Sequence, residues 1–229
     1  MAAKAGAIGT MDSVLGPLTL SMRTPGVAAA FVYASGCRSG SSPPALIAGM
    51  ERAVRAAVAK SDVFDRVRGV LRFGKYKPTG RGKPASEYLA KAALENRFPQ
   101  INNLVDVNNL VSLESGLPIS MVDVGRAETE SFCLRRGRPG EAYVFNASGQ
   151  SIDLEDLLLL ACMPSDRPCA NPVKDSMATK VAPDTDRVLA VVYASPEDRA
   201  RLDDAARGLD EGLRSFGQAT EVVHSVWSL

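Results

Sequence analysis

The chain has 229 residues, of which 45% are apolar and 23% are charged, a balance typical of a globular protein that builds its own core. Its formal net charge of +1 excludes binding of nucleic acid through overall basicity, so any RNA contact must come from a local patch. A single histidine and four cysteines without a C-x-x-C pair provide no zinc-binding pattern, and we expect neither a metal nor a cofactor.

The N-terminal residues lack a sustained hydrophobic period. Residues 1–24 are rich in Ala, Gly and Ser, which predicts a flexible tail followed by a single domain over residues 25–229. The apolar run over residues 14–22 is short and interrupted by Gly16 and Pro17, so it fits neither a signal peptide nor a membrane span. We therefore expect a cytoplasmic protein whose cysteines are reduced.

The first predicted elements of the domain are a strand and two helices. The continuous apolar run over residues 27–33 is typical of a buried strand. Ser42 is expected to cap a helix that has Pro43 at its first position and extends to about residue 58. A shorter helix is predicted over residues 84–96.

The next predicted helix is the most informative element. Asn102 or Asn103 can cap a helix over residues 104–115, Gly116 ends it, and Pro118 prevents its continuation. This helix carries polar side chains directly beside its apolar side, which is unusual for a helix that packs in a core.

The second half of the chain predicts more strands than helices. One long helix is expected to begin at Ser195 or Pro196 and to end at Gly217. Residues 164–183, with four prolines, are expected to be irregular. The order of elements predicts a mixed α/β domain with a central mixed sheet and helices packed around it. The predicted strands cover residues 132–135, 142–145, 157–162, 187–193 and 221–227.

Basic residues are concentrated between residues 66 and 83. This stretch holds seven lysines and arginines and no acidic residue, and two aromatic residues lie between the cations. Positive charge interleaved with aromatic rings is typical of a surface that contacts phosphates and unpaired bases. The alternative is a solvated flexible loop, which the glycines of the stretch would favour. The candidate RNA-contacting residues are Arg72, Lys75, Tyr76, Lys77 and Arg81, with Arg135, Arg136 and Arg138 as a second basic cluster.

The segment VDVNNLVSLESGLP resembles a block of the beta subunit of phenylalanyl-tRNA synthetase, which reads V-D-V-T-N-Y-V, then L-E-x-G-Q-P, then H-A-F-D. That block belongs to the B3/B4 module, which edits mischarged tRNA. The segment TKVAPDTDRVLAVVYASP is similar to the closing strand of the same module. The resemblance is strongest over residues 65–196 and implies the mixed-sheet fold of that module, standing alone. The matching residues are Val105, Asp106, Val107, Asn109, Val111, Leu113, Glu114, Gly116, Pro118 and Asp123.

Three positions depart from the pocket of that module. Where the family carries Thr, His and Glu, this sequence carries Asn108, Ser120 and Val191. Loss of the Glu removes an acceptor for a phenol hydroxyl, so we do not expect the rejection of tyrosine to carry over from the synthetase. We expect Asn108, Ser112 and Ser120 to bind substrate; the alternative is that they cap the helix and bond to loop backbone. No catalytic residue is identified.

Other polar residues are expected to hold the fold. Asp106 and Asn109 are expected to bond backbone in the turns around the helix. Glu114, near the negative end of the helix, is expected to pair with an arginine. His224 lies in the last predicted strand and is expected to be structural, so no Ser-His-Asp or Cys-His arrangement can be assembled.

The resemblance implies an RNA-binding protein whose partner is tRNA or its aminoacylated 3′ end. Whether the chain is an enzyme is left open. The catalytic form would be an aminoacyl-tRNA deacylase that edits in trans, in which positioning and oxyanion donors carry the rate. We find no motif for charging tRNA with ATP. The alternative function is a non-catalytic module that reuses the scaffold for a protein or small-ligand partner.

Overall fold

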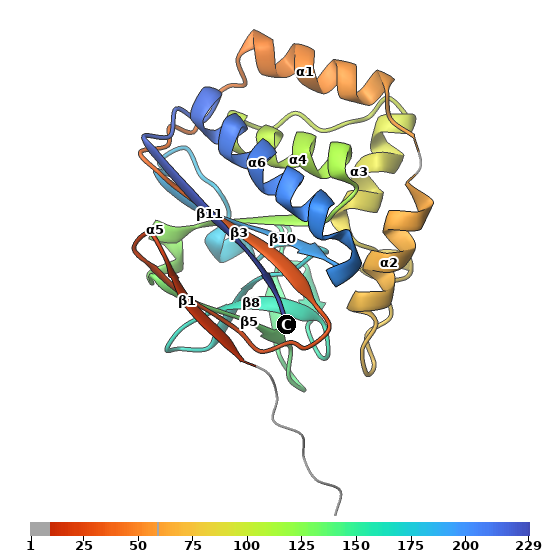
Figure 1. Cartoon of the computed structure of the whole chain (residues 1–229), viewed down its shortest axis with the longest axis vertical. Coiled ribbons are helices and arrows are strands. Elements are labelled where there is room, and N and C mark those ends of the chain that lie inside the picture. The colour runs from red at the N-terminus through yellow and green to blue at the C-terminus, as the bar shows by residue number, and fades with distance from the viewer. Residues whose placement is uncertain (1–9, 59) are drawn as a thin grey trace, which may run out of the picture.

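The computed structural model describes residues 10–58 and 60–229, and two β-sheets form its centre (Figure 1). The first sheet is built from β3 (Ala28–Ser35), β4 (Ile119–Asp123), β10 (Arg187–Ala194) and β11 (Glu221–Ser228). Its strands are antiparallel and follow the order β11-β3-β10-β4, so β3 and β10 are interior strands. Both interior strands are almost wholly buried, which explains their continuous apolar sequences.

The second sheet is mixed. It contains β1 (Met11–Leu15), β2 (Leu18–Met22), β5 (Ser131–Arg136), β8 (Leu158–Cys162) and β9 (Arg167–Ala170). The strands follow the order β1-β2-β5-β8-β9, and only β2 and β5 pair in parallel. The predicted mixed α/β fold is confirmed, although its strands are divided among these two sheets and a separate two-stranded hairpin instead of forming one sheet.

The predicted N-terminal tail is wrong where the structure describes it. Residues 1–9 lie outside the described part of the chain, but residues 11–22 form the β1–β2 hairpin at the edge of the second sheet. The apolar residues of β2 are buried and alternate with polar ones, as in a strand with one buried face. Gly16, with φ at +57°, lies in the turn that interrupts the apolar run.

Helices cover the face of the four-stranded sheet that points away from the second sheet (Figure 1). Helix α6 (Arg199–Ser215) packs on β3, β10 and β11, and α4 (Asn103–Ser115) packs on β4 and on α6. The other helices are α1 (Pro44–Arg55), α2 (Ser61–Leu71), α3 (Ala85–Leu94) and the short α5 (Val124–Ala127). Single 3-10 turns occur at Gly80–Gly82, Met177–Thr179 and Pro196–Asp198.

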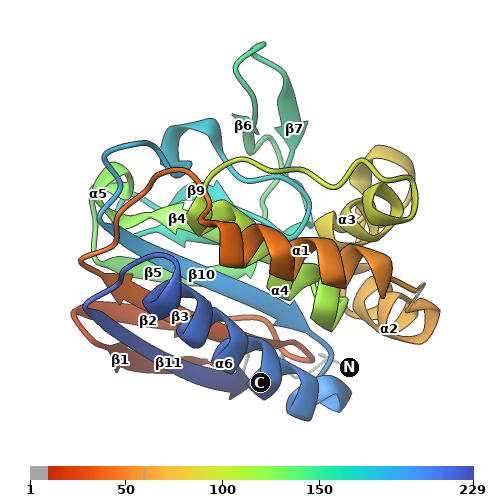
Figure 2. The same ribbon diagram turned by 90° about the horizontal axis from the view of Figure 1, so that it is seen from above.

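A two-stranded hairpin stands away from the body of the protein (Figure 2). It is formed by β6 (Ala142–Val144) and β7 (Ser151–Asp153), which pair in antiparallel fashion. The chain returns from it into β8, so the hairpin is an excursion from the second sheet. Its position beside α3 creates the concave surface described below.

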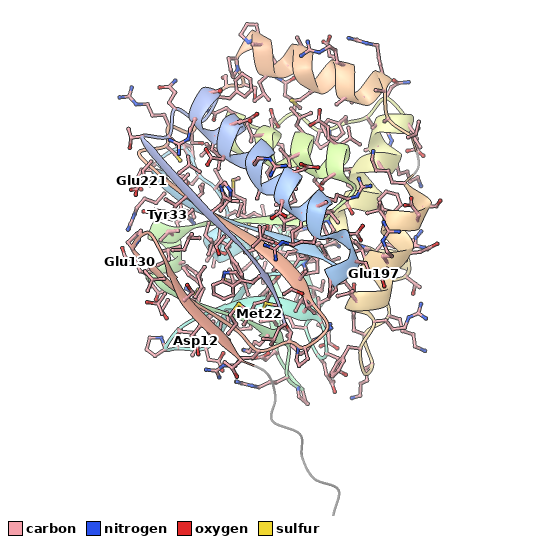
Figure 3. The ribbon with its side chains drawn as sticks, viewed as in Figure 1. Asp12, Met22, Tyr33, Glu130, Glu197 and Glu221 are labelled. Carbon is pink, nitrogen blue, oxygen red and sulfur yellow. The ribbon has the colours of Figure 1, made fainter. Side chains whose placement is uncertain are left out.

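One hydrophobic core joins both sheets and the helices. Met22 of β2 and Tyr33 of β3, labelled in Figure 3, belong to it although they come from different sheets. All four cysteines are buried and free. Among the described residues, no helix has the length and apolar character needed to cross a membrane.

Helix α4 begins and ends as the sequence predicts. The Asn102 side chain accepts a hydrogen bond of 2.9 Å from the Val105 amide, and Gly116 ends the helix in the left-handed conformation with φ at +77°. The helix is buried on most of its sides. It packs closely against α6 at Gly212, a residue without a Cβ atom. A Cβ atom added at Gly212 would lie only 2.6 Å from the Val107 side chain. This close packing explains why α4 has no broad exposed polar face.

Three segments differ from the prediction. Helix α1 begins at Pro44, one residue late, because the Ser42 hydroxyl bonds the carboxylate of Asp106 and does not cap the helix. Helix α2 occupies residues that were not assigned to any element, and its buried residues repeat every four positions. Strand β9 lies inside the segment predicted to be irregular.

Asp106 joins the start of α4 to two preceding loops. Its carboxylate accepts the Ser42 hydroxyl at 2.6 Å and the Ile101 amide at 2.8 Å, and the residue is fully buried, which confirms its structural role. We expect Asp106→Ala to leave both donors unpaired and to lower the free energy of unfolding by about 2–4 kcal/mol, measured by urea unfolding. The exposed Asp184→Ala should change it by less than about 0.5 kcal/mol. Equal stability of the two variants would contradict this role.

Candidate functional site

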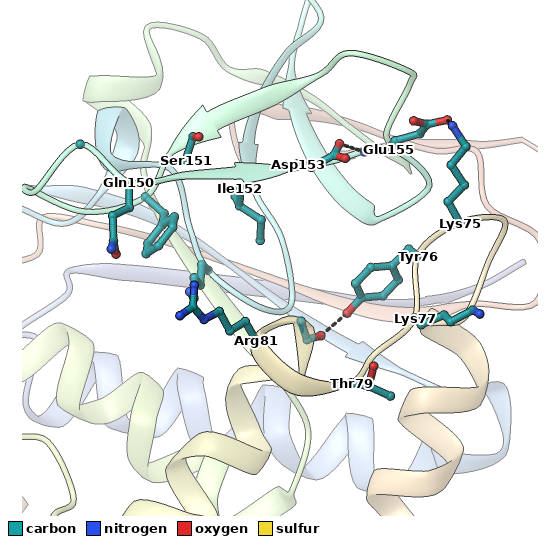
Figure 4. A pocket seen from close by; sticks show the side chains of 14 residues that line it. Lys75, Tyr76, Lys77, Thr79, Arg81, Gln150, Ser151, Ile152, Asp153 and Glu155 are labelled. Carbon is teal, nitrogen blue, oxygen red and sulfur yellow. Dashed lines mark hydrogen bonds and ion pairs between the residues drawn. The ribbon is translucent and has the colours of Figure 1, made fainter.

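Two large cavities adjoin each other beside the β6–β7 hairpin. The first, of about 950 Å³, lies between the loop after α2 and the hairpin (Figure 4). The second, of about 990 Å³, lies between α3 and residues 173–180. Arg81, Phe145 and Lys174 line both cavities, so they form a shared wall. We refer to the two cavities together as the basic groove.

The basic groove carries more positive than negative charge. Two of its acidic residues are already paired, Glu87 with Arg68 and Glu155 with Lys75. A concave surface with this charge balance attracts polyanions. Its basic residues are Lys75, Lys77, Arg81, Lys83, Lys91, Lys174 and Lys180, and its acidic residues are Glu87, Asp153, Glu155 and Asp175.

The first cavity is lined by four of the five predicted RNA-contacting residues: Lys75, Tyr76, Lys77 and Arg81. Arg72, at the end of α2, lines neither cavity. The Tyr76 hydroxyl donates to a backbone carbonyl of the same loop at 2.6 Å, so its half-buried ring supports the loop (Figure 4). Lys77 and Arg81 are exposed and form no ion pair with any described residue. RNA contact by these residues remains a prediction.

The predicted second RNA-contacting cluster is wrong for Arg135 and Arg136. Arg135 is buried, and its guanidinium binds the carboxylates of Glu141 and Asp166 at 2.7 Å each. Arg136 donates to two carbonyls at the end of α2, and its guanidinium lies 4.8 Å from the centre of the Phe73 ring. Burial lowers the pKa of Arg136 to about 10. Both arginines hold the fold together.

Contacts with residues 174–180 fasten the hairpin to the body. The Tyr143 hydroxyl donates to the Lys174 carbonyl at 2.7 Å. The Lys174 ammonium lies 4.0 Å from the centre of the Phe145 ring, a cation–π contact. The Lys180 ammonium donates to the Phe145 carbonyl at 2.6 Å. These contacts fix the wall that the two cavities share.

Asp175 is a carboxylate of the groove whose pKa is clearly raised. It lines the second cavity, is a half-buried residue, and accepts hydrogen bonds from the amides of Met121 at 3.1 Å and Asn171 at 3.4 Å. Burial raises its pKa to about 6, while the nearby Ser120 hydroxyl, the hydrogen bonds from the two amides and the charge of Lys180 oppose the rise. A pKa near neutrality is what general acid–base chemistry requires.

A chain of hydrogen bonds near Asp175 connects β10 and β4 to the loop that follows β9. The Tyr193 hydroxyl donates to Ser120 Oγ at 3.0 Å, and Ser120 Oγ donates to the Asn171 carbonyl at 2.9 Å. The Asn171 side chain accepts the amides two and three residues further on, at 2.7 and 2.8 Å, and so winds the loop into a turn. All three residues are buried, and together they set the position of Asp175.

The three predicted substrate-binding residues are buried at the junction of α4 and β4. The Ser112 hydroxyl donates to the Leu117 carbonyl at 2.7 Å. The Asn108 amide nitrogen lies 3.5 Å from the Ile119 carbonyl, and Asn108 Oδ1 has no hydrogen-bond partner in the described structure. Neither these two residues nor Ser120 line the basic groove, although Ser120 contacts a residue that does. Substrate binding by the three remains a prediction.

The remaining predicted residues lie outside the groove. The Asn109 side chain forms no hydrogen bond with any described residue, so its expected contact with backbone is absent. Glu114 forms no ion pair with a described arginine, and partial burial raises its pKa. His224 Nδ1 lies 3.2 Å from the Asp210 carboxylate, in a structural pair. Val191 is fully buried in β10, opposite Ser120.

Sequence reasoning missed the segment around Asp175, because it treated residues 164–183 as irregular. The Asn-Pro pair at Asn171 and Pro172 is a turn signal that would have pointed to an ordered loop. Nothing local predicts that this loop meets β4, because the contact joins distant parts of the chain. No group of three or more potential metal ligands occurs in the part of the chain that the structure describes.

The chain is similar to known proteins over the region that builds the groove. The family model for the B3/4 domain matches residues 76–211. The phenylalanine–tRNA ligase beta subunit of Moorella thermoacetica is 30% identical over 115 residues, which are 50% of this chain and 14% of that subunit. The chain therefore corresponds to a small part of its relative. The matched family region includes α3, α4, the β6–β7 hairpin and Asp175.

The raised pKa of Asp175 predicts a stability that depends on pH. The folded state holds this proton up to about pH 6, whereas the unfolded chain loses it near the ordinary value of 3.8, so stability falls as the pH rises between them. Relative to Asp175→Asn, the wild type should lose on the order of 2 kcal/mol of unfolding free energy across this range, measured by urea unfolding. Parallel curves for the two proteins would show that the pKa is not raised.

Proposed function

The chain belongs to the B3/4 domain family, and we propose that it binds tRNA and holds the aminoacylated 3′ end in the basic groove. The similar protein from Moorella thermoacetica is a subunit of a tRNA ligase, which makes tRNA the natural candidate partner. The observation that carries the proposal is the row of unpaired basic side chains along a groove that also presents aromatic rings.

Charge and aromatic rings in the groove suit single-stranded RNA. Lys77, Arg81 and Lys83 form no ion pair with any described residue, so their charges are available to phosphates. Tyr88 on α3 is 60% exposed, and the ring of Phe145 lies in the shared wall. Unpaired bases of a tRNA 3′ end stack on such rings.

We further propose that the second cavity takes the aminoacyl ester and that the protein hydrolyses it, as a deacylase acting in trans. Its volume of about 990 Å³ is ample for an amino acid and a terminal ribose. An aminoacyl ester is already activated, so a site that positions water and stabilises negative charge can hydrolyse it.

A non-catalytic module is the second candidate. It is favoured by the burial of Ser112 and Ser120, whose hydroxyls already serve backbone carbonyls. Such a module would bind a protein or a small ligand, and its affinity would not follow the salt dependence of phosphate contacts. The salt dependence of binding therefore separates the two candidates.

The first test removes three charges from the groove. We expect the triple variant Lys77→Ala, Arg81→Ala, Lys83→Ala to bind unacylated tRNA more weakly. With three phosphate contacts fewer, binding releases fewer counterions from the RNA. The slope of log Kd against log salt concentration should decrease in magnitude by roughly 2, measured by fluorescence anisotropy over a salt series.

A matched control removes the same charge elsewhere. Arg52, Arg55 and Arg207 are exposed on α1 and α6, outside the basic groove, and their replacement by Ala should leave affinity and slope nearly unchanged. Equal weakening by both triple variants would mean that only net charge matters. Unchanged binding in the groove variant would reject this surface as the RNA site.

A second test concerns Asn108, which does not line the basic groove. Its buried Oδ1 has no hydrogen-bond partner among the described residues, so Asn108 is a candidate for a polar ligand contact at the junction of α4 and β4. We propose that Asn108→Ala weakens ligand binding or deacylation by roughly ten-fold to a hundred-fold, since an unmatched buried partner costs about 1–3 kcal/mol. Thermal melts should show little loss of stability. Asn103→Ala, which removes three side-chain hydrogen bonds from the same helix, should instead melt early. An Asn108→Ala protein with full binding and activity would exclude the role.

A further inference from the structure

Two carboxylates line the second cavity, and only one of them is paired with a basic residue. Glu87 is held by Arg68 of the neighbouring helix α2. Asp175 forms no ion pair with any residue that the structure describes, and it keeps contact with the cavity. A carboxylate that lines a cavity and has no cationic partner can accept a hydrogen bond from a water molecule or a ligand there.

We propose that Asp175 is the general base that activates water for hydrolysis of an aminoacyl ester in the second cavity. This inference rests on the function proposed above and adds the residue that moves the proton. Neither cysteine nor histidine can serve as the base in the groove. The four cysteines are buried, and the single histidine is paired with Asp210 outside the groove.

Backbone amides orient the Asp175 carboxylate. The Met121 amide, on the edge of β4, lies 3.1 Å from Oδ2, and the Asn171 amide lies 3.4 Å from Oδ1. A carboxylate has about four acceptor positions, so these two bonds leave positions open for water. Because the amides belong to the backbone, the orientation of the base does not depend on mobile side chains.

The two tyrosines and the cysteine that surround Asp175 do not change charge near neutral pH, whereas Asp175 does. Burial raises the pKa of Tyr143 on β6, of Tyr193 on β10 and of Cys169 on β9, so all three stay neutral. The charge of Lys180 favours the ionised carboxylate, but burial raises the pKa of Asp175 to about 6. The other charged residues that line the cavity are Arg81, Lys83, Glu87, Lys91 and Lys174.

The proposed step balances with water as the co-reactant. The Asp175 carboxylate takes one proton from a water molecule as the water oxygen bonds to the ester carbonyl carbon. When the tetrahedral intermediate collapses, the bond from this carbon to the ribose oxygen breaks. The leaving ribose oxygen takes the proton back from Asp175. The products are a free amino acid and a tRNA with a free 3′-terminal hydroxyl.

Single-turnover deacylation tests the proposal. The probe is a panel of tRNAs, each charged with one amino acid and including mischarged pairs, incubated with excess protein. For any ester that the wild type hydrolyses, we expect the rate to rise with pH and to level off above about pH 6. Asp175→Asn should reduce this rate by roughly a hundred-fold to ten-thousand-fold, with affinity for unacylated tRNA retained. Asp184→Asn, a matched change at an exposed carboxylate outside the basic groove, should keep the wild-type rate.

The outcomes separate this inference from the proposed function. If the wild type binds tRNA but hydrolyses no ester of the panel, the general base is overturned while RNA binding stands. If neither binding nor hydrolysis occurs, the proposed function itself fails. Hydrolysis that survives in Asp175→Asn would also overturn the inference. Should that variant not fold, the wild-type pH profile still decides, because a rate that is flat between about pH 5 and about pH 7 contradicts a base with this pKa.

Discussion

The free edge of β4 is closed by a side chain instead of a strand, and the geometry of the groove depends on this contact. β4 is wholly buried but pairs only with β10. On its other side, the Met121 amide donates to the Asp175 carboxylate, and Ser120 donates to the Asn171 carbonyl. A buried edge must satisfy its donors, and here the partner is an ionisable group. Closing the sheet in this way places a carboxylate with a raised pKa beside a large cavity.

The sequence predicted the elements whose burial is continuous or strongly periodic. The strands near Phe31 and Val191 and the helix capped by Asn102 were found because each carries a local pattern that its packing preserves. The β1–β2 hairpin was missed because its strands are five residues long and its turn contains Gly16 and Pro17. Short strands carry too few alternations to be separated from a loop.

The candidate site was only partly predictable, for a different reason. A stretch of basic residues is visible in a sequence, but their partners are not: Arg135 finds Glu141 and Asp166, whereas Lys77 finds none among the described residues. The perturbation of Asp175 likewise arises from tertiary contacts with β4. Periodicity reports which residues are buried, and it does not report which ionisable groups meet.

The hairpin β6–β7 makes the groove adjustable without changes to the core. Its tip, residues 147–150, is exposed, while its base is anchored through Tyr143 and Phe145 to the segment that carries Asp175. Insertions at exposed tips are tolerated far better than changes in packed strands. The length of the β6–β7 hairpin can therefore change in evolution without a change in the position of Asp175. Relatives that share this scaffold can differ in the length of this wall while they keep the same carboxylate beside the cavity.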